Sequence, residues 1–165
     1  MKRPSFTDVY TLFLSDPVAA KIILSKDIIG YIKEAEDINK LLEMLTLDEK
    51  IEFFKELNNA GAGLDINELL REVEPYTALR NFYDFVDNGA DINKLAEKVL
   101  KDENIDIFFE GDIIDELLEN GMDAGRLFDL CHPAIEQNED ALEVNEFIER
   151  FRGYLPNEKL KQYLK

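Results

Sequence analysis

One stretch decides the fold of this 165-residue chain: Asp91-Ile92-Asn93-Lys94-Leu95-Ala96-Glu97-Lys98-Val99. Its apolar residues stand at i, i+3, i+4 and i+7, the spacing that lines one face of an α-helix. Asp91 in front of them is a good N-cap, because a carboxylate accepts hydrogen bonds from the free N–H groups of the first turn. The stretch therefore predicts a short amphipathic helix that begins after Asp91.

The same four-point apolar pattern occurs five times along the chain. Three copies begin Asp-Ile-Asn, the fourth reads Asp123-Ala124-Gly125, and the fifth reads Glu143-Val144-Asn145. Repetition of this kind predicts an array of helical units, each burying one face against its neighbours. The apolar sets are Ile38, Leu41, Leu42 and Leu45; Ile66, Leu69, Leu70 and Val73; Ile92, Leu95, Ala96 and Val99; Ala124, Leu127, Phe128 and Cys131; Val144, Phe147, Ile148 and Phe151.

A partner helix is predicted upstream of the second, third and fourth copies. These partner helices should stop at turns that contain Gly61, Gly89 and Gly121, because Gly and Asn tolerate the left-handed conformation at a helix C-terminus. The unit is then a longer helix, a tight turn and a shorter helix. The apolar faces of the partner helices are Leu47, Ile51 and Phe54; Leu79, Phe82, Tyr83 and Val86; Ile113, Ile114, Leu117 and Leu118.

These patterns predict an all-α fold, a short solenoid of repeated helix-turn-helix hairpins in a single domain over residues 1–165. We expect N-terminal helices in 1–36, the repeats in 37–152, and a C-terminal capping helix within 153–165, from Pro156 to Leu164. The chain has no run of alternating β-branched residues of the kind that indicates a sheet.

The turn Asn88-Gly89-Ala90-Asp91-Ile92-Asn93, after Phe82-Tyr83-Asp84-Phe85-Val86, resembles the end of an ankyrin repeat. The stretch from Ile113 to Asp123 is similar, and so, more weakly, is that from Ile51 to Asn67. The Thr-Pro-Leu-His stretch that starts an ankyrin helix pair is absent. The resemblance implies a non-catalytic, protein-binding function.

The net charge of −17 is distributed unevenly along the chain. Residues 105–149 carry 14 acidic side chains against one basic side chain, Arg126. Such a segment repels nucleic acid and attracts a basic partner. No apolar run is long enough to span a membrane, and a lone cysteine fits a reducing compartment, so we expect a cytoplasmic protein.

The pair Cys131-His132 is the one sequence feature that suggests an enzyme. A cysteine nucleophile needs a base within hydrogen-bond reach, whereas adjacent helical residues point about 100° apart. Cys131 also occupies the repeat position of Leu45, which predicts a buried core thiol. His132 precedes Pro133 and is expected to end its helix. We predict no catalytic residue, no cofactor and no metal site, since one histidine cannot supply paired Glu-x-x-His motifs.

Acidic residues are the candidate binding site. One acidic stripe follows the i, i+3, i+4, i+7 spacing on a single helix, and like charges at i, i+4 destabilise a helix by about 0.2–0.5 kcal/mol per pair. The stripe is either solvated, or paired with Lys94, Lys98 and Lys101 on the preceding helix, or the contact for a partner. The candidate residues are Asp112, Asp115, Glu116 and Glu119, continued by Glu136, Glu139, Asp140 and Glu143.

The favoured hypothesis is a non-enzymatic module whose acidic surface docks on the basic surface of a partner protein. One specific form is an inhibitor that imitates nucleic-acid charge and occupies the channel of a nucleic-acid-binding protein. The alternative is a helical-repeat scaffold or effector module that binds its partner through an apolar concave face. An enzyme is the third hypothesis. The sequence does not decide the oligomeric state.

Overall fold

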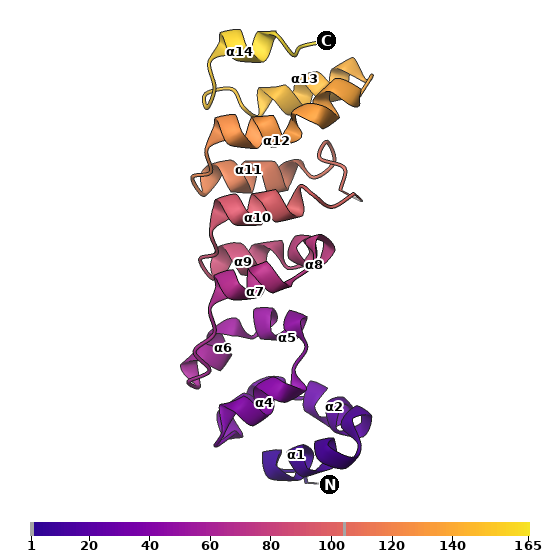
Figure 1. Ribbon diagram of the computed structural model, residues 1–165, viewed down its shortest axis with the longest axis vertical. Helices are drawn as coiled ribbons and strands as arrows, with labels where there is room; N and C mark the ends of the chain where they lie inside the picture. The colour runs from indigo at the N-terminus through magenta and orange to yellow at the C-terminus, as the bar shows by residue number, and fades with distance from the viewer. Residues whose placement is uncertain (1, 104) are drawn as a thin grey trace. The chain divides into compact units, whose positions relative to one another are not determined.

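The computed structural model describes residues 2–103 and 105–165, and the chain is all-α over these ranges (Figure 1). Within them the one β-type pairing is an isolated bridge between Arg152 and Leu155. The residues group into two compact units. The first unit runs to Val73 and includes Tyr83–Asn88, and the second comprises Glu74–Phe82 and Gly89–Lys165.

The first unit packs its helices around a core that includes Leu24, Leu41 and Leu57, all fully buried. Tyr31 is also fully buried, and its hydroxyl donates to the Pro4 carbonyl at 2.9 Å. The helices are α1 (Phe6–Ser15), α2 (Pro17–Ser25), α3 (Ile28–Glu34), α4 (Ile38–Met44), α5 (Leu47–Glu52), α6 (Phe54–Asn59), α7 (Ile66–Glu72) and all but the first residue of α9 (Phe82–Asp87).

The second unit has an aromatic core. The Phe128 ring meets the Phe151 ring edge to face at a centroid distance of 5.1 Å, and the Phe147 and Phe151 centroids lie 5.6 Å apart. The helices are α8 (Pro75–Arg80), α10 (Ile92–Val99), α11 (Gly111–Glu119), α12 (Ala124–Gln137), α13 (Ala141–Glu149) and α14 (Asn157–Lys161).

The predicted aspartate caps are confirmed. The carboxylates of Asp37, Asp65, Asp91 and Asp123 each accept a backbone N–H of the first turn of α4, α7, α10 and α12. The apolar sets that follow them face the core, since most of their members are buried. The half-buried members are Ile38, Leu42, Ile92 and Ala124.

The fifth helix begins ahead of its apolar set. The set follows Glu143, but α13 begins at Ala141 with Asp140 as its N-cap. The Asp140 carboxylate accepts the Glu143 N–H at 3.1 Å, and the Asn138 side-chain oxygen accepts the Asp140 N–H at 2.8 Å. A fixed aspartate therefore starts the helix ahead of the glutamate.

Two predicted partner helices are each broken into two short helices. A break at Phe53 separates α5 from α6, and a break at Asn81 separates α8 from α9. At the second break the Asn81 side chain donates to the Thr77 carbonyl at 3.0 Å, which fills an acceptor at the end of α8. The apolar face predicted there was wrong at Tyr83, which is 53% exposed. Phe82 is buried as predicted and Leu79 and Val86 are half-buried, whereas the other buried side chains are Ala78 and Phe85.

The glycine turns are confirmed. Gly89 and Gly121 have φ values of 79° and 85°, a region that L-residues other than Asn and Asp seldom adopt. The preceding Asn120 side chain donates to the Glu116 carbonyl at 2.8 Å and so fills an acceptor at the end of α11. The third partner helix, α11, also buries its predicted apolar face of Ile113, Ile114, Leu117 and Leu118.

The prediction that His132 ends its helix was wrong. Helix α12 continues through Pro133 to Gln137. The proline removes one backbone hydrogen bond, but its ring lies on the exposed side while Ile135 extends the buried face by another turn. Burial of Ile135 offsets the loss. The C-terminal helix α14 is shorter than predicted and ends at Lys161.

Candidate functional site

Helix α11 presents its acidic stripe on the side away from the core. Asp112 and Glu119 are exposed, whereas Asp115 and Glu116 are partly buried. The Glu116 carboxylate accepts the Asn120 side-chain amide at 3.1 Å. The stripe is therefore not a uniform row of solvated charges.

Asp115 forms an ion pair with Arg150, which follows the last residue of α13. The Arg150 guanidinium also donates to the Gly111 carbonyl at 3.2 Å and so binds two positions of α11. Asp115 is thus paired within the fold, but not with Lys94, Lys98 or Lys101, the cations that the sequence suggested. The cation is an arginine 35 residues away along the chain.

The second group of candidate residues surrounds the start of α13. The Glu136 carboxylate lies 3.1 Å from His132 Nε2, and the Glu143 carboxylate accepts from the Asn138 side chain at 2.7 Å. Asp140 caps the helix. Glu139 is exposed.

Three of the eight candidate carboxylates are exposed and have no ion pair or hydrogen bond with the described residues: Asp112, Glu119 and Glu139. Glu110 and Glu146, which are not among these eight candidates, share these properties. Glu110 precedes α11 without capping it through its side chain. We call these five residues the exposed acidic set.

The only base inside 105–149 does not neutralise this set. Arg126 pairs with Glu97 of α10, which lies outside the acidic segment. Three of the bases that follow the segment pair with acids inside it: Arg150 with Asp115, Arg152 with Glu149 at 2.6 Å, and Lys159 with Asp129 at 3.8 Å. None of these acids belongs to the exposed acidic set. The second unit therefore presents uncompensated negative charge.

Gly111→Ala should destabilise the second unit by about 1–2 kcal/mol. A Cβ on Gly111 would overlap the Arg150 guanidinium, so the end of the arginine side chain would have to shift, which should weaken its contacts with Asp115 and the Gly111 carbonyl. Urea unfolding followed by circular dichroism measures the loss.

Gly125→Ala is the matched control, because its Cβ would meet only the Asp123 carboxylate at 3.2 Å. Because this glycine lies in a helix, alanine should leave the stability of the protein unchanged or raise it by up to about 1 kcal/mol. Equal effects of the two substitutions would show that the Arg150 contacts contribute nothing to stability.

Cys131 and His132 do not form a nucleophile and base. Cys131 is 1% exposed, which confirms the predicted core position, and burial raises the pKa of its thiol to about 12. The His132 ring is directed to other partners, Glu136 and the Tyr163 ring at a centroid distance of 5.0 Å. A thiol with such a pKa is not a nucleophile at neutral pH.

The first unit has an apolar groove of about 660 Å³ beside α2. Phe13, Pro17 and Met44 line it together with Val18 and Ile22, which are 72% and 58% exposed. Lys21 at its edge donates to the Met44 carbonyl at 2.9 Å and pairs with Glu49. Burial by itself would raise the pKa of Glu49, but hydrogen bonds from Lys21 and Thr46 outweigh it and lower that pKa.

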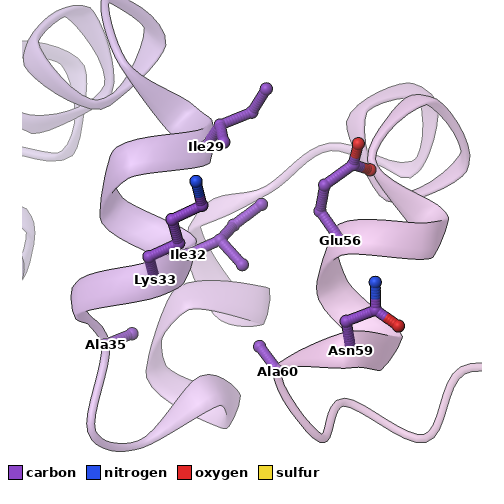
Figure 2. Close-up of a pocket in the computed structure, with 7 residues that line it drawn as sticks. All are labelled: Ile29, Ile32, Lys33, Ala35, Glu56, Asn59 and Ala60. Atoms are coloured by element: carbon purple, nitrogen blue, oxygen red, sulfur yellow. The ribbon is translucent and has the colours of Figure 1, made fainter.

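A second cavity of the first unit, of about 400 Å³, lies between α3 and α6. Figure 2 shows Ile29, Ile32 and Lys33 on one side, facing Glu56 and the nearby Asn59 and Ala60 on the other. Its polar groups are one amine, one carboxylate and one amide. Neither the cysteine nor the histidine of the chain lines it. This set offers binding groups but no pair of a nucleophile and a base.

Over the described residues, no group of three or more His, Cys, Asp or Glu side chains is arranged to hold a metal ion. No helix in this part of the chain is long and apolar enough to cross a membrane. The chain matches no protein-family model, no curated protein sequence and no solved structure.

Proposed function

We propose that this chain is a non-enzymatic protein-binding module that docks its acidic second unit on a basic surface of a partner protein. The observation that supports the proposal is the exposed acidic set, since none of its carboxylates is used to cap a helix or to pair with an internal cation. Charges that stabilise nothing within the fold are available for a partner.

Three of these carboxylates stand on helices, which hold them in fixed positions: Asp112 and Glu119 on α11, and Glu146 on α13. A charge held by a helix loses little conformational entropy on binding, so a basic surface meets a preorganised array. Exposed charges of this kind mainly speed association and set its salt dependence.

In its specific form, the proposal is an inhibitor whose carboxylates take the place of phosphates in the channel of a nucleic-acid-binding protein. The protein then binds no nucleic acid itself, and it acts in the cytoplasm. We also propose that its hairpins are repeats of one ankyrin-like unit, stacked as a short solenoid. The shared aspartate caps and the glycine turns support this relation between the hairpins.

The triple variant Asp112→Asn, Glu119→Gln, Glu139→Gln should associate roughly tenfold more slowly with a partner captured from the native host. It removes three exposed charges that make no hydrogen bond or ion pair with the described residues, so its stability should be unchanged or slightly higher. Association rates measured by surface plasmon resonance over a range of NaCl concentrations test this. The rate should also depend less steeply on salt than that of the natural protein.

The control removes the same charge from the first unit, as Glu52→Gln, Glu68→Gln and Glu72→Gln, all at exposed positions. If net charge alone drives association, both triple variants will slow it equally. If neither variant changes the rate, the acidic surface is not the contact, and the proposal is wrong.

The apolar groove beside α2 favours a second candidate, a scaffold or effector module that binds through apolar side chains. Val18 and Ile22 stand at i, i+4 on its rim and leave a large part of their apolar surface in water. Binding there would resist high salt and would be lost in Val18→Gln with Ile22→Gln. If capture of the partner protein does not depend on salt and the double variant abolishes it, the second candidate is favoured over the first.

A further inference from the structure

Phe109 is the most exposed of the large apolar side chains in the described residues, at 81%. The adjacent Phe108 is half-buried, and its ring packs edge to face on Phe147 with the centroids 5.2 Å apart. Packing Phe108 on Phe147 leaves the neighbouring side chain directed outward. A phenyl ring left almost wholly in water does not contribute to the core and needs another explanation.

The loop before α11 holds Phe109 in a defined position. The Asp106 carbonyl accepts the N–H groups of Phe109 and Glu110, each at 3.1 Å, and the Asp106 carboxylate accepts the Phe108 N–H at 3.0 Å. The hydrogen bonds to Asp106 fix the backbone of the turn, and the packing of Phe108 on Phe147 fixes its position against the second unit. The exposed ring is therefore preorganised for a partner.

Three acidic residues lie within three positions of Phe109 in the sequence. Asp106, Glu110 and Asp112 are all exposed, and the Glu110 side chain makes no capping bond. An aromatic face attracts a cation through its quadrupole, and carboxylates beside it add ionic hydrogen bonds. The combination suits a cation that is flat enough to lie on a ring and carries several N–H donors at its edge. Guanidinium has that shape, and ammonium does not.

We propose that Phe109 and its flanking carboxylates bind an arginine side chain of the partner, so that the docking module selects arginine-rich over lysine-rich basic segments. The guanidinium plane lies on the Phe109 ring, and Glu110 or Asp112 accepts from its edge. This inference rests on the proposed function, because it names the chemistry of the partner that the acidic surface attracts.

Two labelled peptides of equal length and charge, hexaarginine and hexalysine, are the probes. Fluorescence anisotropy should show that the natural protein prefers hexaarginine, and that Phe109→Ala reduces this preference about fivefold. Phe109→Leu should behave like Phe109→Ala, because leucine keeps apolar surface but has no ring quadrupole. Thermal unfolding of both variants should match that of the natural protein, since the side chain is exposed.

Tyr154→Ala is the matched control, because Tyr154 is also an exposed aromatic of the second unit, at 50%, but lies in the base-rich segment after 149. It should leave the arginine preference unchanged. A preference that survives Phe109→Ala overturns the inference, and one that Phe109→Leu retains in full overturns it in favour of simple apolar contact. The double variant Glu119→Gln with Glu139→Gln keeps Phe109, Glu110 and Asp112, so it separates the two proposals: if it binds both peptides as the natural protein does, the proposed function fails, whatever Phe109 does.

Discussion

Phe128→Ala is expected to lower the free energy of unfolding of the second unit by about 3–5 kcal/mol. The Phe128 side chain is fully buried and meets the rings of Phe151 and Tyr163 edge to face, at centroid distances of 5.1 and 5.0 Å. The Lys159 amine lies over the ring, 5.6 Å from its centroid. The Phe128 side chain thus connects α12 to Phe151, just after α13, and to Lys159 and Tyr163, in and just after α14.

Alanine at position 128 would leave a cavity next to Phe151, Lys159 and Tyr163, and these side chains would have to move to fill it. Urea unfolding followed by circular dichroism measures the loss, and the control is Phe109→Ala, the same chemical change at a position that is 81% exposed. The control should change stability by less than about 0.5 kcal/mol. Similar effects of the two substitutions would contradict the aromatic core described for this unit.

Local chemistry made the helix starts predictable. A side-chain cap acts within three residues of its own position, so Asp37, Asp65, Asp91 and Asp123 could be assigned from the sequence alone. The same holds for the glycine turns, where backbone conformation restricts the choice of residue. The fifth helix starts after Asp140, three residues ahead of Glu143, so the residue that opens an apolar set is not always the cap.

The helix interiors were less predictable, because an apolar pattern cannot show where a helix breaks. The spacing of Leu79, Phe82, Tyr83 and Val86 fits a continuous helix, but the break at Asn81 changes the buried face to Ala78, Phe82 and Phe85. Pro133 shows the reverse case, in which a strong local stop signal yields to the burial of Ile135. In both cases the tertiary environment outweighs the local preference.

The charge of the candidate site could be read from the sequence, whereas its pairing could not. Nothing near Asp115 in the sequence indicates Arg150, because the two are brought together by the packing of the second unit. The exposure of Phe109 was equally hidden, since Phe108 and Phe109 are adjacent and chemically identical. The turn held by Asp106 packs Phe108 on Phe147 and leaves Phe109 exposed, and the sequence does not show this difference.

Cys131 gives the chain a sensitivity to alkaline pH. Burial raises the pKa of its thiol from 9.0 to about 12, so between these values the unfolded chain releases a proton that the folded chain keeps. The folded state then binds more protons than the unfolded state, and stability falls as the pH rises. The slope should reach up to about 1.4 kcal/mol per pH unit. Below pH 9 the contribution of the thiol should be constant.

Cys131→Val should remove this slope while keeping the fold, because valine fills the equivalent repeat position at Val73 and Val99. Lysines and tyrosines also titrate in alkali, but they do so in both proteins, so the difference between the two stability curves isolates the thiol. Urea unfolding at intervals from pH 8 to pH 11 provides those curves. The folded natural protein should also react with a thiol reagent only as fast as it opens. If the stability curves of the two proteins run parallel, or if a thiol reagent labels the natural protein rapidly at neutral pH, Cys131 is accessible to solvent and is not buried in the core.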